Sequence, residues 1–479
     1  LLDRFDQRLP FELTAGQVEV GRTVLADLAA DHPMHRLLQG EVGSGKTVVA
    51  LRAMLRVVDS GGQAALLAPT EVLAQQHLRS VTAMLGDLAG AGMLGGAADA
   101  TAVTLLTGSL GAAARRAALL DTASGAAGIV IGTHALLEER VRFADLGLVV
   151  VDEQHRFGVE QRAALAAKSD GAPPHVLVMT ATPIPRTVAM TVFGDLETST
   201  LRELPSGRAP VQTNVVALPD HPSWLARAYA RVREEVERGH QVYVVCPRIG
   251  GDDPAGAGPR DARSAGTASA AEDEGPGTAA VDEVVPMLAQ GPLQGLRVQA
   301  LHGRLAADRK DEVMRAFAAG DVDVLVSTTV IEVGVDVGNA TMMVILDAER
   351  FGVSQLHQLR GRVGRGGHPG LCLLVTNAPV GSPPLRRLEA VAATSDGFEL
   401  SRVDLEQRRE GDVLGVSQSG RRSSLRLLNV LDHEEDIVEA RAVATELVAA
   451  DPDLADHPLL AAQVRRMHEA EQADYLEKA

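Results

Sequence analysis

The sequence predicts an α/β protein: two parallel-sheet domains in series, followed by a mostly helical C-terminal segment. Two stretches support this prediction, from about residue 37 to 204 and from 211 to 376. In each, short apolar or β-branched runs alternate with polar turns and helix-favouring segments, a pattern typical of strands joined by crossover helices. Beyond residue 376 the strand signals stop. The length of 479 residues suits this division, since one domain takes roughly 100–200 residues.

The apolar runs place the individual strands. In the first stretch, a strand at Leu37 and Leu38 leads into a helix at 48–58. The further strands expected there are 63–68, 128–132, 146–151 and 175–179, and those of the second stretch are 242–246, 297–301, 322–327, 342–346 and 371–375. The predicted domains are 1–207, 208–380 and 381–479, with a Pro/Gly-containing hinge at 205–210 and a loop at 411–424.

A low-complexity segment interrupts the second domain at about 250–280. It consists mainly of Gly, Ala, Pro, Ser, Asp and Glu, and it holds too little apolar surface to form a core. We therefore expect a disordered surface insertion.

Composition excludes several classes of protein. The 46 basic and 63 acidic residues give a net charge of −17, which argues against nucleic-acid binding by bulk charge but leaves room for a local basic track. A membrane span and a signal peptide are not expected, because the required apolar runs are missing from the sequence. Two cysteines, Cys246 and Cys372, are too few for a disulfide scaffold, which fits a cytoplasmic protein. The chain begins with Leu1 rather than Met, so it could be a piece of a longer protein.

A phosphate-binding loop is predicted at 40–47, Gly-Glu-Val-Gly-Ser-Gly-Lys-Thr. Its position between a strand and a helix is the context in which this pattern is a P-loop. Gly43 and Gly45 let backbone N–H groups face the phosphates, Lys46 reaches the β- and γ-phosphates, and the Thr47 hydroxyl holds Mg²⁺. A chance glycine-rich turn is the weaker alternative.

A second anchor for magnesium is predicted at the end of the strand 146–151. Asp152 is placed to hold Mg²⁺ through water, and Glu153 to orient or deprotonate the attacking water. The alternative is an ordinary acidic turn after a strand.

Phosphoryl transfer also needs positive charge near the γ-phosphate. Residues 358–365 offer Gln358 and the arginines Arg360, Arg362 and Arg365. Arginine suits this role because its planar fork grips phosphate oxygens at a fixed geometry. A solvated basic loop or a nucleic-acid patch would explain the same run, and spacing alone does not decide between them.

Together, these motifs resemble the RecG family of superfamily 2 helicases, of the DEAD/DEAH type. The resemblance covers nearly the whole chain except the 250–280 insertion and the last few tens of residues. It rests on ordered motifs at 9–17, 40–47, 68–71, 132–134, 152–159, 180–187, 302–304, 328–336 and 357–366. It implies two RecA-like domains and an ATP- and Mg²⁺-dependent DNA translocase. This motor would remodel stalled forks and Holliday junctions in recombination and repair. A cytoplasmic, monomeric motor is implied, with single-stranded DNA-binding protein as a further partner.

The resemblance also assigns residues to the ATP site. Phe11 and Gln17 match the adenine-recognition motif, although Phe11 could merely fasten the chain to the first domain. Arg362 and Arg365 would act as arginine fingers. The remaining matches are Gly334 and Asp336, which complete the site from the second domain, and Thr180 and Thr182, which link hydrolysis to domain movement.

DNA contacts are expected from strand-end turns on a face opposite the P-loop, where small polar residues and N–H groups bind phosphates without reading bases. The candidates are Pro69, Thr70, Gly132, Thr133, His134, His302 and Arg304. Thr70 and Thr133 have an alternative role as helix N-caps or turn residues.

Two alternatives are weighed against the RecG family. The Mfd family has a similar motor, but residues 152–155, Asp-Glu-Gln-His, favour RecG, since Mfd-like motors typically carry Glu at the third place. The segment 404–420 resembles the helical hairpin and loop by which both families couple ATP turnover to DNA translocation. Its plausible moving residues are Arg408, Arg409, Gln418 and Ser419, although Arg409-Glu410 departs from the Gly-rich link of the family. His155 is also predicted to take part in DNA binding or in coupling hydrolysis to movement.

The other alternative is an ATP-binding module without hydrolysis, which the retained Lys46, Asp152, Glu153 and Arg365 argue against. RecG proteins also carry an N-terminal wedge domain, and the few residues before Phe11 cannot form one. Either the chain is the motor portion of such a protein, or the natural protein lacks the wedge.

Overall fold

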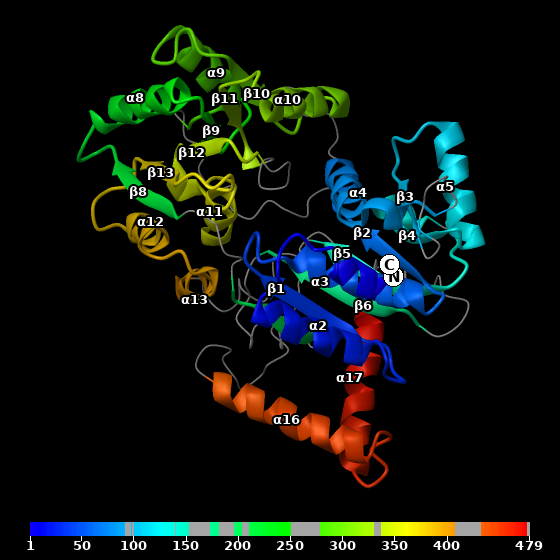
Figure 1. Ribbon diagram of the computed structural model, residues 1–479. Coiled ribbons are helices and arrows are strands. Elements are labelled where there is room, and N and C mark those ends of the chain that lie inside the picture. The colour runs from blue at the N-terminus through cyan, green and yellow to red at the C-terminus, as the bar shows by residue number, and fades with distance from the viewer. Residues whose placement is uncertain are drawn as a thin grey trace. The chain divides into compact units, whose positions relative to one another are not determined.

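The computed structural model describes residues 1–91, 97, 100–138, 140–152, 173–181, 196–203, 210–250, 278–329, 337–407 and 433–476. The chain divides into two compact units, one made of Leu1–Pro185 with Gly194–Gln407 and the other of Arg186–Phe193 with Arg408–Ala479. The first unit holds two parallel β-sheets (Figure 1). The predicted fold class is thereby confirmed. Most of the predicted insertion and hinge, and the whole predicted loop at 411–424, lie outside the described residues.

The first sheet has seven strands, and every pair described in it is parallel. In spatial order they are β3 (Ala102–Leu106), β4 (Ala127–Gly132), β2 (Gln63–Leu67), β5 (Leu146–Asp152), β6 (His175–Thr180), β1 (His35–Gly40) and β7 (Glu197–Leu201). Its helices are α1 (Leu2–Asp6), α2 (Ala15–Asp27), α3 (Lys46–Asp59), α4 (Glu71–Leu85) and α5 (Ala112–Ser124), with the 3₁₀ turns η1 (Gly86–Ala89) and η2 (His134–Leu137).

The second sheet has six strands, also parallel throughout its described pairs. Their order is β10 (Val298–Leu301), β11 (Val324–Ser327), β9 (Gln241–Val245), β12 (Ala340–Ile345), β13 (Gly370–Thr376) and β8 (Val211–Ala217). The associated helices are α8 (Trp224–Glu237), α9 (Val281–Gln290), α10 (Ala307–Ala319), α11 (Val353–Arg360), α12 (Pro383–Ala393) and α13 (Gly397–Gln407), with the turn η6 (Ala348–Arg350).

Three of these strands were not among the expected ones: β3, β7 and β8. Each lies at an edge of its sheet and is only partly buried. An edge strand has a neighbour on one side only and carries more polar residues, so its apolar pattern is weak. The other strands agree with the expected ones to within two residues.

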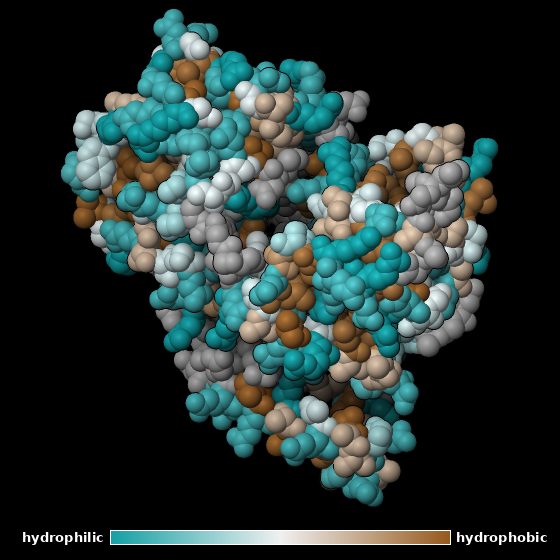
Figure 2. Space-filling model, in the orientation of Figure 1, coloured by the Kyte–Doolittle hydropathy of each residue, from teal (hydrophilic) through white to brown (hydrophobic). Residues whose placement is uncertain are grey.

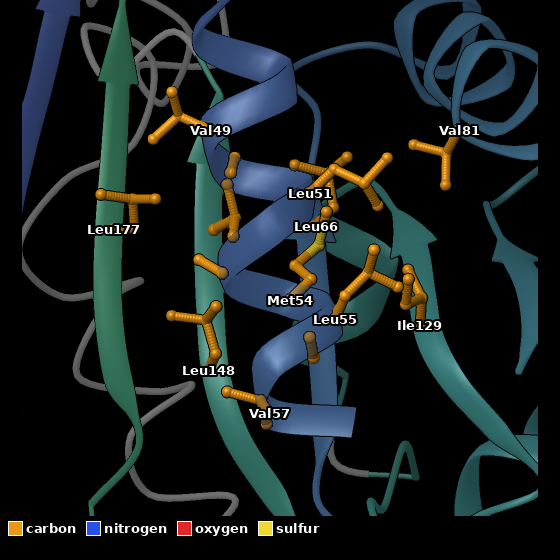
Figure 3. Packing of buried hydrophobic residues seen from close by; sticks show 14 of the residues in the cluster. Val49, Leu51, Met54, Leu55, Val57, Leu66, Val81, Ile129, Leu148 and Leu177 are labelled. Carbon is orange, nitrogen blue, oxygen red and sulfur yellow. The ribbon is translucent and has the colours of Figure 1, made fainter. Parts of the chain in front are cut away.

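Helix α3 anchors the P-loop on the first sheet. Its buried residues Leu51 and Met54 pack among the strand residues Leu66, Leu148 and Leu177 (Figure 3). A parallel sheet covered by helices buries its strands on both faces, and burying one Leu or Met side chain stabilises a fold by about 1.5–3 kcal/mol. The loop that precedes α3 is therefore built on a rigid base.

The second sheet has a separate core on each face. Val242 and Val244 of β9 pack with α8 and α9, whereas Tyr243 and Val245 pack with α10, α11 and α12. This alternation follows from the two-residue period of a strand. The sheet is therefore covered by helices on both faces.

The second unit is helical where it is described, in α16 (Glu434–Ala450) and α17 (Pro458–Leu476). Several of its apolar side chains are exposed, Leu459 and Met467 among them.

On the face of the molecule shown in Figure 2, hydrophilic residues predominate and apolar ones are scattered among them. None of the helices in the described ranges is long and apolar enough to cross a membrane.

Both cysteines are free and buried in the second-sheet domain. Burial raises the pKa of Cys246 and that of Cys372 to about 12. The thiolate is the reactive form of cysteine, so both side chains behave as small apolar core residues at neutral pH.

Candidate ATP site and nucleic-acid interface

Three adjacent strands of the first sheet bring the phosphate-site residues together. Strand β6 lies between β1, which leads into the P-loop, and β5, which ends at Asp152. The register pairs Gln39 with Thr180 and Asp152 with Met179. Since the strands are parallel, the P-loop, Asp152 and Thr180 lie at one carboxyl edge, which is where open α/β sheets bind ligands.

The P-loop has the backbone that its glycines predict. Gly43 and Gly45 have φ angles of 86° and 84°, in the left-handed region that favours glycine. A side chain at Gly45 would also clash with the Gln17 amide. The Lys46 ammonium donates to the carbonyl oxygens of Gly40 (2.8 Å) and Glu41 (2.9 Å). The positive charge of Lys46 is thus held inside the predicted phosphate-binding loop.

The oxygen atoms of this edge suit magnesium. Thr47 is the second residue of α3 and offers a hydroxyl, and Asp152 offers a carboxylate. Mg²⁺ binds hard oxygen ligands and usually keeps several waters, so one hydroxyl and one carboxylate are enough when a triphosphate supplies the rest. The described residues contain no group of three or more His, Cys, Asp or Glu side chains placed to hold a metal ion.

The two residues predicted to recognise adenine differ in exposure. Phe11 is 48% exposed and lines a shallow hollow with Leu9, Pro10 and Val18, so its ring is available for stacking rather than buried as a fastener. Gln17 is buried. Its amide nitrogen donates to the carbonyl of Ser44 in the P-loop, at 2.8 Å.

Gln17 also completes a capping box at the start of α2. Its amide oxygen accepts from the Thr14 N–H at 3.0 Å, and the Thr14 hydroxyl accepts from the Gln17 N–H at 3.3 Å. Gln17 therefore ties the start of the chain to the P-loop.

We expect Gln17→Ala to weaken ATP binding about tenfold, because the Ser44 carbonyl loses its partner and an unsatisfied buried group costs about 1–3 kcal/mol. Fluorescence titration with a mant-labelled ATP analogue measures the affinity. Gln17→Glu is the matched control, since a carboxylate still accepts from Thr14 but cannot donate to Ser44. Wild-type affinity in Gln17→Glu would contradict this role.

The predicted DNA turns of the first domain occupy the other half of the same sheet. Strand β2 ends before Pro69 and Thr70, and β4 ends at Gly132, directly before Thr133 and His134. The Ala68 N–H donates to the Gly132 carbonyl at 2.8 Å and holds the two turns together. The expectation of a face opposite the P-loop is wrong, because parallel strands place all these turns at the P-loop's own edge.

The individual side chains of these turns differ in exposure. Thr70 is the N-cap of α4, and its hydroxyl accepts from the Leu73 N–H at 3.3 Å, as its alternative role predicted. His134 is exposed, whereas Thr133 is buried. Gly132 leaves no room for a Cβ, which would clash with the Leu106 carbonyl. Backbone groups and His134 are therefore the accessible ones.

The second-sheet candidates follow β10. His302 is partly buried, with its Nε2 3.8 Å from an Asp282 carboxylate oxygen. Arg304 is exposed and donates to the Gly250 carbonyl at 2.7 Å. Both residues lie beyond an edge strand of the sheet.

The arginine segment begins on α11. Gln358 and Arg360 are buried, and Arg362 and Arg365 are half-buried. Arg365 Nε donates to the Gly361 carbonyl at 2.8 Å. Gly361 lies beside the P-loop, because a Cβ added to Gly361 would be 3.5 Å from the Cβ of Val42. The hydrogen bond to Gly361 therefore places Arg365 near the P-loop.

Arg360 has a different role from its neighbours. It donates to the carbonyls of Val391 (2.9 Å) and Thr394 (2.7 Å), at the end of α12, and to His357 Nδ1 (2.7 Å). Burial lowers the pKa of Arg360 below its ordinary value. Arg360 therefore stabilises the connection from α12 to α13 rather than a phosphate.

Two side chains at this edge were missed by sequence reasoning. Glu41, inside the P-loop, accepts a hydrogen bond at 2.9 Å from the N–H of Gly397, the first residue of α13. His77, on α4, lies 2.7 Å from the Asp152 carboxylate. Seven predicted site residues lie outside the described residues: Glu153, His155, Thr182, Gly334, Asp336, Arg408 and Gln418.

Comparison with known protein families finds two helicase domains. Residues 17–191 match the DEAD/DEAH box helicase family, and residues 277–367 match the helicase conserved C-terminal domain. A protein of Mycobacterium bovis named ATP-dependent DNA helicase RecG is 56% identical over 474 residues, which are 99% of this chain and 62% of that protein. Its Bacillus subtilis namesake is 43% identical over 450 residues, 94% of this chain and 60% of that protein.

Solved structures give the same result. A RecG bound to a three-way DNA junction has a TM-score of 0.69 and 36% identity, covering 91% of this chain and 51% of that one. The RNA-bound Dbp5 of S. cerevisiae, at a TM-score of 0.56 and 17% identity, shares the fold alone. The chain spans 62% or less of the length of the M. bovis and B. subtilis relatives. With its ordered motifs and its near-complete alignment to these proteins, the chain matches the motor portion of the RecG helicases.

Proposed function

We propose that this chain is the ATP-driven motor of a RecG-type DNA helicase, which translocates on double-stranded DNA and remodels branched DNA such as stalled forks and Holliday junctions. The observation that carries the proposal is the division of the first sheet's carboxyl edge. The half formed by β1, β6 and β5 holds the phosphate site, and the half formed by β2 and β4 holds the turns suited to a nucleic-acid backbone. Because both sets of turns lie on one sheet, binding and hydrolysis of ATP can change the affinity of the neighbouring turns for DNA.

The proposed roles follow the chemistry of each group. Lys46 neutralises the phosphates, Thr47 and Asp152 hold Mg²⁺, and Glu153 orients the attacking water. When bound, Mg²⁺ would neutralise charge on the β- and γ-phosphates. Arg362 and Arg365 stabilise the charge that develops as the γ-phosphate leaves. The match to a RecG bound to a three-way DNA junction supports branched DNA as the substrate.

The test is steady-state ATP hydrolysis by this chain without DNA and with single strands, linear duplex or a four-way junction of equal nucleotide content. We expect DNA to stimulate hydrolysis and the junction to stimulate it most. Equal stimulation by every DNA would contradict branch sensing by the motor, and no stimulation by any DNA would contradict the function itself.

A further inference from the structure

Helix α4 places a histidine against the magnesium-site carboxylate. The His77 Nε2 lies 2.7 Å from Oδ2 of Asp152, and the two side chains are only 12% and 15% exposed. A carboxylate without its proton can only accept hydrogen bonds, so Nε2 carries the hydrogen and donates it. This contact joins residues 75 positions apart in the sequence.

The position of His77 on its helix is one that apolar residues usually fill. Residues three and four apart share a helix face, so His77 lies on the face of Ala74 and Val81. Both are fully buried in the core of the first domain, and Figure 3 shows Val81 beside the side chains of α3. A polar residue on this face must be satisfied by a partner, and Asp152 provides one.

The same helix begins at a predicted DNA turn. Thr70 caps its first turn, and the strand before it, β2, pairs with β5 through Leu67 and Val151. Helix α4 therefore starts on the DNA half of the sheet edge and reaches, at His77, the last residue of the strand on the ATP half. Its buried residues Ala74, Val81 and Leu85 pack against the core and make it a rigid element.

We propose that His77 is a positioning residue, which orients the Asp152 carboxylate for Mg²⁺ and couples that orientation to the Thr70 turn through α4. The part concerning DNA rests on the proposed function. A carboxylate that binds a metal is commonly held by a second hydrogen bond, and loss of such a partner typically costs 10–100-fold in metal affinity or activity. Because α4 is a rigid element, a small displacement of the Thr70 turn on DNA would tilt the helix and change the hydrogen bond to Asp152.

The experiment compares three variants of the full chain. His77→Leu fills the buried site but removes the donor, and His77→Gln keeps an N–H donor. Val81→Ala, on the same helix face, removes packing but leaves the hydrogen bond in place. Circular dichroism and thermal unfolding establish that each variant is folded.

The first measurement is the affinity for mant-ADP with Mg²⁺ and with EDTA. We expect His77→Leu to lose about 10–100-fold in affinity with Mg²⁺ and nothing with EDTA. His77→Gln should recover most of that loss, and Val81→Ala should match the wild type. If His77→Leu and Val81→Ala behave alike, His77 is a packing residue and the proposal is overturned.

The second measurement is the ratio of DNA-stimulated to basal hydrolysis at saturating Mg²⁺, with DNA affinity measured by fluorescence anisotropy. We expect His77→Leu to bind DNA normally and to lose stimulation. Full stimulation in His77→Leu would overturn the coupling through α4. A wild-type chain that DNA does not stimulate would reject the proposed function instead, while the mant-ADP titration still decides whether His77 holds Asp152.

Discussion

Arg365→Ala is expected to lower the rate of ATP hydrolysis by about 10³-fold or more while ATP still binds, because an arginine finger acts on the transition state and contributes roughly 10³–10⁵ in kcat. The guanidinium follows α11 and is half-buried, and its Nε is fixed by the Gly361 carbonyl at 2.8 Å. That hydrogen bond orients the fork without neutralising its charge. Single-turnover hydrolysis together with mant-ATP titration separates the chemical step from binding.

Two further variants sharpen this prediction. Arg365→Lys should not restore the rate, since an ammonium cannot reproduce the planar fork. Arg227→Ala is the control on the same domain, because Arg227 on α8 is exposed and its partner Glu234 is partly exposed, and an ion pair between exposed side chains contributes little. A fall of less than tenfold in Arg365→Ala would reject the finger, and an equal loss in Arg227→Ala would indicate general damage to the domain.

The interior strands could be predicted because burial on both faces makes them continuously apolar. Strand β5 is an example, with four consecutive buried residues from Leu148 to Val151. Strand β7, Glu-Thr-Ser-Thr-Leu, gives the opposite case, since it pairs only with β1 at the sheet edge and is largely polar. Its place is determined by the neighbouring strand, which a local pattern does not describe.

The residues of the candidate site also fall into two groups, those that the local sequence predicts and those that depend on contacts between distant parts of the chain. The P-loop glycines are local in the sequence, so spacing alone predicted their backbone. His77 and Glu41 act on Asp152 and Gly397, which are distant along the chain. Finding His77 requires the strand order, in which β2 lies beside β5, and finding Glu41 requires the position of α13. One signal was present in the sequence: a histidine on the face of α4 that Ala74 and Val81 make apolar.

Lys46→Ala is expected to reduce hydrolysis by about 10²–10³-fold and to weaken ATP binding as well, because one fixed positive donor to the phosphates is lost. The reason lies in the loop itself. Lys46 Nζ is held by the Gly40 and Glu41 carbonyls at 2.8 and 2.9 Å, so its charge stays within the phosphate cradle. Removing it leaves two carbonyl dipoles facing a triphosphate.

The fold should survive this change, since Lys46 opens α3 and alanine is a good helix former. Lys46→Arg distinguishes the effect of the positive charge from the effect of the side-chain shape. The guanidinium keeps the charge, but its wider fork does not fit between the two loop carbonyls. We expect Lys46→Arg to bind mant-ATP better than Lys46→Ala and to hydrolyse ATP almost as poorly. If Lys46→Ala retained more than a tenth of the wild-type rate, the loop would not be the phosphate site. The magnesium-binding roles proposed for Thr47 and Asp152 would then be rejected as well.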